Sequence, residues 1–397
     1  MSKSDFKFFR GLDLDGGDIY RLQGSIDHIK RIAALDPEAK AFNTLGYVKT
    51  SKADINAADL KPSQYYQSGD GVYVKKEYLT NDNVHSDKII RIKPLCNWCT
   101  TAEFVRTWGL MSDSVKSIEE ANKPGARFIY KNKDGVSIEL VDSDDVDFWT
   151  IVNYPSSPDV YDKSKTIVFQ AEPSCKAANV PWGVHSWGIW AEPNETEFLA
   201  VHGRNQDVLN VGQSELELTK FELENLDENQ PRLDVVSSMC SSKFFDPGHI
   251  LRVNFLRYLE EKGGVKLNIY SYDNGLGFKN FRGPLYKFQN KSKGYLPYKY
   301  YFMAENNSEE NFVTEKIWEP ILCECLVFYW GCPNIERWID ERAYVKLDFN
   351  DFPASYELIK RAIAEDWWSQ RLPYIRAEKA KILEQYMFLP LAAKYVN

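Results

Sequence analysis

The sequence has no apolar run of the roughly 18 residues that a membrane-spanning helix needs. Its longest apolar stretch, PILCECLVFYWGC, is interrupted by Glu324 and is more typical of a buried core segment. The first residues, MSKSDFKFFRG, lack the apolar core of a secretory signal peptide. These absences predict a cytoplasmic chain without a membrane span, or one from which an anchor has been removed.

Several common site motifs are also missing. The sequence contains no G-x-G-x-x-G, Walker A or G-x-S-x-G motif, which disfavours the usual dinucleotide, P-loop and hydrolase sites. The five histidines are scattered, with no HExxH-like pair. Among the seven cysteines, Cys96 and Cys99 have CxxC spacing, but no second pair follows at a zinc-site distance. We therefore expect free buried thiols.

Acidic residues outnumber basic residues in the chain, by 57 to 49. Its net charge of −8 argues against a nucleic-acid partner or an anionic membrane surface that binds by bulk charge. A local basic pocket for a diphosphate remains compatible with this charge.

The length of 397 residues predicts two or three domains. In the first segment, Ile26, Ile29, Ile32 and Ala33 recur at helical spacing after Ser25, a suitable N-cap. The sequences AFNTLGYVKTS and GVYVKK then predict short strands. This pattern resembles PAN/apple modules, although the cysteines that staple such modules are missing. The alternative is a small α+β appendage with a structural role.

Strands and helices alternate from residue 89 onward, which favours parallel sheets with crossover helices. The polar stretch ENLDENQPR separates two such blocks, and the last helix is expected to break at Pro373. We therefore predict an α/β fold with two Rossmann-like lobes facing a cleft, plus a small α+β N-terminal module. The predicted boundaries are 1–85, 86–225, 232–360 and, for C-terminal helices packing back across the lobes, 361–397.

A polar cluster lies between two apolar stretches in YYFMAENNSEENFVTEKIWEPILCECLVFYW. The first strand delivers Glu305 and Asn306 at its carboxyl end, where open α/β sheets bind ligands. Thr314 can cap the following helix, and Glu315 suits its first turn. Lys316 opposes the helix dipole unless an anion covers the helix end. A diphosphate is one interpretation, and a solvated helix start is the other.

These residues resemble the donor-binding signature of glycosyltransferase family 10, the α1,3/4-fucosyltransferases. That signature runs "YKFxLxFENS", then "DYxTEKxW", then an apolar helix and a strand. This sequence departs from it at Asn311, where the family usually has Asp, at the inserted Asn307, and at Pro320 inside the helix. The matching residues are Tyr298, Lys299, Glu305, Asn306, Ser308, Phe312, Thr314, Glu315, Lys316 and Trp318.

The resemblance extends upstream. VVSSMCSSKFFDPGHILRVNFLRYL is similar to a family segment in which an arginine contacts the diphosphate, which places Arg252 in that role, with Ser238 and Ser242 beside it. TIVFQAEP ends like a family strand whose Glu is the catalytic base, so Glu172 is the candidate base. The alternatives are an exposed helix charge for Arg252 and a turn residue for Glu172.

The resemblance implies a GT-B enzyme that transfers fucose from GDP-fucose to a glycan hydroxyl with inversion. Glu172 would be the base, Arg252 and Lys316 would stabilise the diphosphate, and the nucleoside and sugar would contact other residues of the signature. These are Glu315, Asn306, Glu305, Thr314, Tyr298, Tyr300, Phe312 and Ser242. No strand-end carboxylate pair is present, so no metal and no cofactor are expected.

Acceptor recognition is predicted for VPWGVHSWGIWAEP, where His185, Trp187 and Trp190 offer rings for sugar stacking. Core or lid packing is the alternative for that stretch. Two other functions stay open: the same fold with a different nucleotide sugar, and a glycan-binding protein without catalysis.

Overall fold

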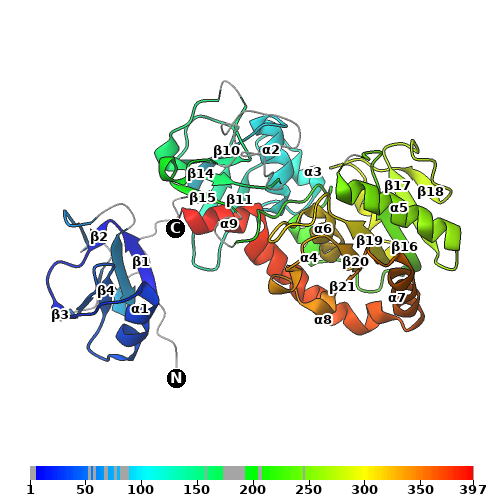
Figure 1. Ribbon diagram of the computed structural model, residues 1–397. Helices are drawn as coiled ribbons and strands as arrows, with labels where there is room; N and C mark the ends of the chain where they lie inside the picture. Colours follow the sequence, from blue (N-terminus) through cyan, green and yellow to red (C-terminus); the bar gives the residue numbers. More distant parts are fainter. Residues whose placement is uncertain are drawn as a thin grey trace. The chain divides into compact units, whose positions relative to one another are not determined.

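The computed structural model (Figure 1) describes residues 6–51, 55–56, 60–66, 70–75, 78–80, 89–156, 159–172, 193–203, 208–244 and 246–396. The chain divides into two compact units, Met1–Lys88 and Ile89–Asn397. Within the described ranges, none of the helices combines the length and the apolar character needed to cross a membrane.

The first unit packs one helix against an antiparallel sheet. Helix α1 (Ile26–Leu35) begins where the Ser25 hydroxyl accepts a hydrogen bond from the His28 N–H at 3.3 Å, as predicted. The sheet has the order β1-β8-β4-β5-β3, and β2 pairs with β7 and β6 with β9. The resemblance to PAN/apple modules stays a prediction. The strands are β1 (Phe6–Arg10), β2 (Leu12–Asp13), β3 (Asp18–Arg21), β4 (Ala41–Asn43), β5 (Tyr47–Lys49), β6 (Ile55–Asn56), β7 (Lys61–Pro62), β8 (Gly71–Lys75) and β9 (Leu79–Thr80).

The first lobe of the second unit is a six-stranded sheet of order β11-β12-β10-β13-β14-β15. All its pairs are parallel except β11 with β12. Helix α2 begins at a capping box in which Thr100 and Glu103 bond each other's backbone N–H groups. The elements are β10 (Ile90–Cys96), α2 (Thr101–Trp108), α3 (Ile118–Ala121), β11 (Phe128–Lys131), β12 (Ser137–Leu140), β13 (Phe148–Val152), β14 (Thr166–Phe169), β15 (Ala200–His202) and α4 (Lys220–Glu224).

The second lobe is a six-stranded, wholly parallel sheet of order β18-β17-β16-β19-β20-β21. Counted along the chain, this is the 3-2-1-4-5-6 order of a Rossmann fold. The predicted fold class, two Rossmann-like lobes after a small α+β module, is therefore confirmed. The elements are β16 (Leu233–Met239), α5 (Pro247–Lys262), β17 (Leu267–Ser271), β18 (Phe281–Pro284), β19 (Tyr298–Ala304), α6 (Glu315–Leu322), β20 (Leu326–Trp330) and β21 (Tyr344–Lys346).

Each sheet of the second unit has a point at which the strand order reverses. It lies between β10 and β13 in the first lobe and between β16 and β19 in the second. Ligands of open α/β sheets bind outside the carboxyl ends of the strands at such a point. The loops after β10, β13, β16 and β19 are therefore where binding sites are expected.

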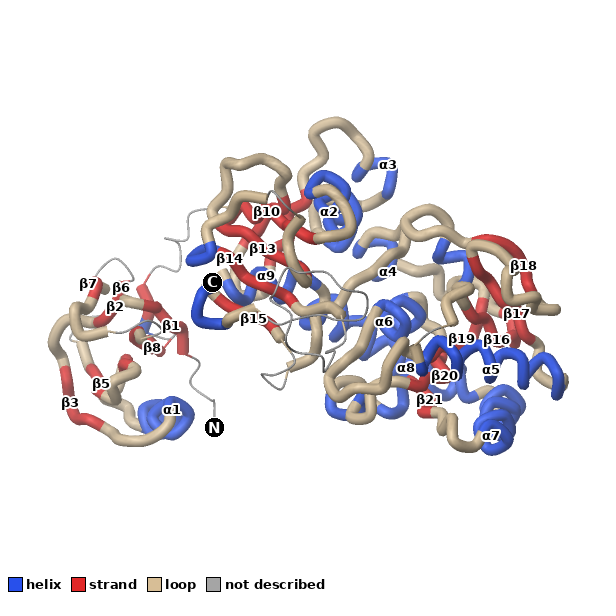
Figure 2. The backbone as a smooth tube through the Cα atoms, turned by 45° about the horizontal axis from the view of Figure 1, so that its top comes forward, coloured by secondary structure: helices blue, strands red, loops and turns tan. Residues whose placement is uncertain are grey.

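The C-terminal helices connect the two lobes (Figure 2). Helices α7 (Phe352–Ala364) and α8 (Trp367–Lys381) pack on the second lobe, whereas α9 (Phe388–Tyr395) contacts β11 and β12 of the first. The break expected at Pro373 is wrong. Pro373 lies inside α8, and the chain turns instead at Asp366, which has a left-handed φ of 47°.

Gly248 allows α5 to begin against the end of β19. Its N–H donates to the Asn306 carbonyl at 2.9 Å, and a Cβ built at Gly248 would lie 1.8 Å from the Glu305 carbonyl oxygen. We expect Gly248→Ala to destabilise the chain by about 1–3 kcal/mol, because only a backbone shift can relieve this clash. Chemical denaturation measures the loss. Gly203→Ala, with its nearest atom at 3.5 Å, is the matched control and should change little.

Candidate functional site

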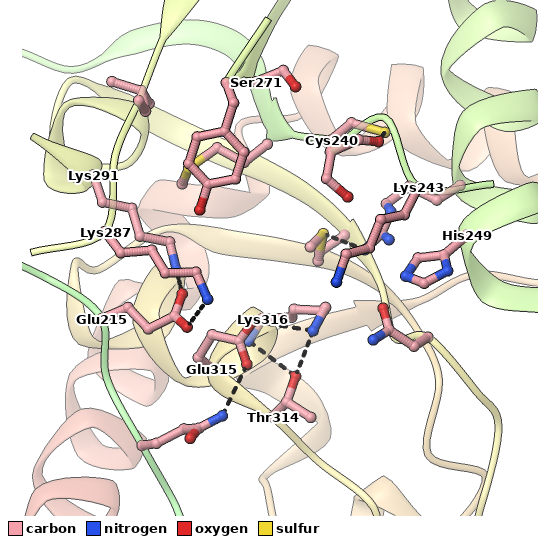
Figure 3. Close-up of a pocket in the computed structure, with 18 of the residues that line it drawn as sticks. Glu215, Cys240, Lys243, His249, Ser271, Lys287, Lys291, Thr314, Glu315 and Lys316 are labelled. Atoms are coloured by element: carbon pink, nitrogen blue, oxygen red, sulfur yellow. Dashed lines mark hydrogen bonds and ion pairs between the residues drawn. The ribbon is translucent and has the colours of Figure 1, made fainter. Parts of the chain in front are cut away.

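A cavity of about 320 Å³ opens at the strand-order reversal of the second lobe. Its walls come from the loop after β16, the first turns of α5 and α6, and the loop before β19. Ala171 and Glu172 of the first lobe close its other side. Figure 3 shows Lys287 and Lys291 on one side, Lys243 and His249 on the other, and Thr314–Lys316 between them.

Glu305 holds Thr314, the N-cap residue of helix α6, in place. This carboxylate is fully buried and accepts hydrogen bonds from the Thr314 N–H at 2.9 Å and the Thr314 hydroxyl at 2.6 Å. Burial raises the pKa of Glu305, and the charge of Lys316 acts against that shift. Glu305 does not line the cavity, so the structure gives it a supporting position in place of the ligand contact implied by the resemblance.

Lys316 lines the cavity, and its amino group lies close to three side-chain oxygen atoms. Its Nζ lies 3.0 Å from Glu315 Oε1, 3.2 Å from Thr314 Oγ1 and 3.8 Å from Glu305 Oε2. Glu315 also accepts a hydrogen bond from Gln213 Nε2 at 3.4 Å. Burial opposes the ionisation of Glu315, but Lys316, Lys291 and Lys287 together hold its pKa below the usual range. Glu315 is therefore a carboxylate that stays ionised.

Arg252 faces the cavity from the buried side of α5. It is 2% exposed, and its Nη1 donates to the Ala304 carbonyl at 2.8 Å. Its Nε has no hydrogen-bond partner, and no carboxylate within the described ranges pairs with the guanidinium. A buried charge without a counter-ion is costly. This arrangement therefore favours an anionic ligand in the cavity.

His249 lies one turn before Arg252 and also lines the cavity. Burial, together with Arg252, Lys316 and Lys243, lowers its pKa to about 4. Its Nδ1 accepts the Asp246 N–H at 3.3 Å. The ring is therefore neutral at pH 7, with Nδ1 as its acceptor nitrogen.

Lys287 and Lys291 bring further positive charge from the loop before β19. Both contact Glu215, and Lys291 Nζ also lies 2.6 Å from the fully buried Glu319. Burial raises the pKa of Glu319, which Lys291 opposes. Sequence reasoning missed both lysines, because the segment before β19 contains only a short 3-10 helix, Lys291–Gly294, and has no periodicity to mark them.

Glu172 stands at the carboxyl end of β14 and lines the same cavity. Asn153, in a left-handed conformation with φ of 63°, fixes this strand end by accepting the N–H groups of Ala171 at 2.9 Å and Glu172 at 3.2 Å. Burial raises the pKa of Glu172, while Lys316 acts in the opposite direction. A raised pKa lies nearer to neutral pH, and an efficient general base has a pKa near the pH at which it works.

The aromatic side chains of β19 divide between its two faces. Tyr301 and Met303 line the cavity, whereas Tyr298 and Tyr300 are buried on the opposite face. There the Tyr298 hydroxyl lies 2.6 Å from the Tyr270 hydroxyl, and Tyr300 donates to the Ala362 carbonyl. The strand alternation thus gives Tyr298 and Tyr300 a core position, away from the donor contact implied by the resemblance.

The remaining predicted residues fall into three groups. Asn306, Phe312, Thr314 and Glu315 line the cavity, and the Asn306 Oδ1 is buried without a hydrogen-bond partner within the described ranges. Ser242 is exposed and does not line the cavity, whereas its neighbours Ser241 and Lys243 do. His185, Trp187 and Trp190 lie outside the described residues and stay predictions.

Tyr272 adds an aromatic side chain that sequence reasoning also missed. It lines the cavity, is 47% exposed, and has its ring centroid 5.8 Å from that of Tyr286. No group of three or more potential metal ligands occurs among the described residues.

Comparisons with known proteins give short sequence matches. No protein-family model matches the chain. The chain is 36% identical over 80 residues to "Putative glycosyltransferase R655" of Acanthamoeba polyphaga mimivirus, which is 20% of this chain and 24% of that protein. It is 31% identical over 72 residues to "GDP-fucose protein O-fucosyltransferase 3" of Danio rerio, 18% of this chain and 16% of that protein. The chain thus spans a quarter or less of the curated relatives it matches.

Solved structures of similar proteins include a crystal structure of an α1,3-fucosyltransferase with GDP. It aligns over 71% of this chain and 81% of its own, with a TM-score of 0.41 and 15% identity. A second structure, of an α1,3-fucosyltransferase with GDP-fucose, covers 75% of this chain and 92% of its own, with a TM-score of 0.35 and 15% identity.

Proposed function

We propose that this protein is a glycosyltransferase that transfers fucose from GDP-fucose to a glycan hydroxyl with inversion at the anomeric carbon. The observation that carries the proposal is Arg252, a buried guanidinium with no carboxylate partner in the described part of the chain. It faces a cavity at the strand-order reversal of a Rossmann-like sheet, with Lys316 at the floor and Glu172 entering from the other lobe.

The diphosphate of the donor would occupy the space between Arg252 and Lys316. Lys316 lies in the first turn of α6, where backbone N–H groups and the dipole add to the attraction for an anion, and Arg252 lies in the second turn of α5. Asn306 Oδ1, still without a partner, is an acceptor for a donor hydroxyl. Glu315, held ionised by three lysines, can accept vicinal ribose hydroxyls.

The reaction then needs one base and one stabilised leaving group. Glu172 takes the proton of the acceptor hydroxyl, whose oxygen attacks the anomeric carbon on the face opposite the diphosphate. The bond from that carbon to the phosphate oxygen breaks, and GDP leaves with the electron pair. Arg252 and Lys316 stabilise the negative charge that develops on the diphosphate.

Fixed cations take the part that a metal ion has in many other transferases, so the proposed reaction needs no metal and no cofactor. The short matches to a putative glycosyltransferase and to a GDP-fucose protein O-fucosyltransferase support this class of reaction. Because no carboxylate in the described part of the chain pairs with Arg252, a purely structural cavity without an anion is disfavoured.

A nucleotide screen tests the proposal. Thermal unfolding is followed with GDP, GDP-fucose, UDP, CDP or ADP, each with EDTA in excess. Because ligands that bind the native state stabilise it, a guanine nucleotide at 100 times its Kd should add about 2.7 kcal/mol, and the other nucleotides should add little. Hydrolysis of GDP-fucose should persist with EDTA.

Each other result has a definite meaning. If no nucleoside diphosphate raises the unfolding temperature, the proposal is wrong. Stabilisation by UDP and not by GDP would mean that the donor is a UDP-sugar, and the proposed glycosyltransferase reaction would otherwise stand. Binding without any donor turnover, with a glycan or with water, favours a glycan-binding protein. Activity that EDTA removes and manganese restores reveals a metal site.

A further inference from the structure

A second cavity, of about 430 Å³, adjoins the first. It lies at the strand-order reversal of the first lobe, where the loop after β10 meets the carboxyl ends of β13 and β14. One face of α2 and Phe288 complete its wall. Its volume is within the range of about 300–1,000 Å³ that is usual for small-ligand sites.

The two cavities meet at Glu172. Ala171, Glu172, Gln213, Glu215 and Lys287 line both of them. A ligand in the second cavity therefore reaches the candidate base from one side, while a ligand in the first reaches it from the other. This is the arrangement that a direct transfer between two substrates requires.

The two cavities differ in charge. Three glutamates and five lysines or arginines line the first, so its lining favours an anion. Among the described residues, three glutamates and two basic residues, Arg106 and Lys287, line the second. The second cavity is therefore suited to a neutral or weakly charged molecule.

Its other side chains suit a sugar. Trp98, in the loop after β10, is 46% exposed and offers a ring face, with Trp108 at a centroid distance of 6.4 Å. Asn97 Oδ1 is buried and has no hydrogen-bond partner within the described ranges. An aromatic face beside one convergent polar acceptor is the usual composition of a small-ligand site.

We propose that this second cavity binds the acceptor sugar, with Trp98 stacking on the ring and Asn97 accepting a hydroxyl. The inference rests on the proposed function and deepens it by placing the acceptor between β10 and α2. Sequence reasoning places acceptor recognition at residues 180–193 instead, and of these all but Pro193 lie outside the described residues.

A sugar fits this cavity better than an extended peptide. Peptides that bind sheets add a strand to a free edge. Strand β10 pairs with β12 on one side and β13 on the other, so it offers no such edge. A cavity of this volume with Trp98 and Trp108 in its lining favours one or two sugar rings.

The test uses the full chain with GDP present, applied to a glycan array and to an array of Ser- and Thr-containing peptides. Wild-type protein should retain a defined set of glycans. Trp98→Ala should weaken retention of those glycans by about tenfold, because an aromatic stacking contact contributes about this much. Trp98→Phe should restore part of it. Calorimetry with GDP should give the wild-type affinity for both variants.

The control is Phe221→Ala. Phe221 is 42% exposed on α4 and lines neither cavity, so its loss should leave glycan retention unchanged. The inference is overturned if no glycan is retained, if Trp98→Ala retains the same glycans as strongly as wild type, or if peptides are bound in place of glycans. Failure of the wild-type protein to bind GDP is a separate result, which counts against the proposed function itself.

Discussion

Replacing Glu172 by glutamine should lower kcat by about 10²–10⁴, the usual contribution of a general base. The amide keeps the size of the side chain but cannot take the acceptor proton. GDP affinity should stay near the wild-type value, because the candidate diphosphate contacts belong to the other lobe. The rate of GDP release from GDP-fucose, with water or a retained glycan as acceptor, measures kcat, and calorimetry measures the affinity.

The pH dependence gives a second readout. Burial raises the pKa of Glu172, and its carboxylate must be ionised to act as a base, so the wild-type rate should rise as the pH increases through that raised pKa. The acidic limb of the profile should disappear in Glu172→Gln. A residue with only a structural role would leave the shape of the profile unchanged.

Other carboxylates in the cavity are less suitable bases. The lysines around Glu315 hold its pKa low, and Glu215 is paired with Lys287 and Lys291. Glu195 is exposed and lines neither cavity, so Glu195→Gln is the matched control with wild-type kcat. A Glu172→Gln variant with near-normal kcat would exclude Glu172 as the base.

Sequence reasoning succeeded where one local pattern determines the structure. Strand β19 and helix α6 follow from a continuous apolar run, a cap at Thr314 and a second apolar run. The resemblance that places Arg252 beside a ligand rests on one continuous segment, and Arg252 is buried beside the cavity. In each case, the deciding residues lie within a few positions of one another.

Sequence reasoning failed where residues far apart in the sequence determine the arrangement of the candidate site. Lys291 reaches the cavity because Glu215, 76 positions earlier, and Glu319 hold it there. Tyr298 and Tyr301 are both aromatic and both buried, so composition cannot tell which of them faces the ligand. On a central strand covered on both faces, only the register decides that, and it emerges from the whole sheet.

Removing the charge of Lys316 should weaken GDP binding by about 10- to 150-fold, which corresponds to about 1.5–3 kcal/mol for one charge-assisted contact. Lys316 Nζ lies at the α6 start, where the diphosphate is proposed to sit, and only 12% of its side chain is exposed. Lys316→Met keeps much of the apolar stem, and Lys316→Arg keeps the charge. Calorimetry with GDP should show the loss for Met and only a small one for Arg.

Lys316 also has two carboxylates within 4.0 Å, those of Glu305 and Glu315, so the experiment must separate ligand contact from support. Without Lys316, the pKa of Glu315 should move up towards its ordinary value. Since a lowered carboxylate pKa stabilises the folded state above the unfolded pKa, the Met variant should lose stability at neutral pH and less of it in acid. Lys299→Met is the matched control, because Lys299 pairs with Asp234 and Asp366 away from the cavity.

Guanosine, which lacks the diphosphate, decides between the two roles. If Lys316 contacts the diphosphate, Lys316→Met weakens GDP binding and leaves guanosine binding at the wild-type level. If both affinities fall by the same factor, Lys316 supports the shape of the cavity and does not contact the phosphates. The buried Arg252 would then remain as the cation for the leaving group, because it has no carboxylate partner in the described part of the chain.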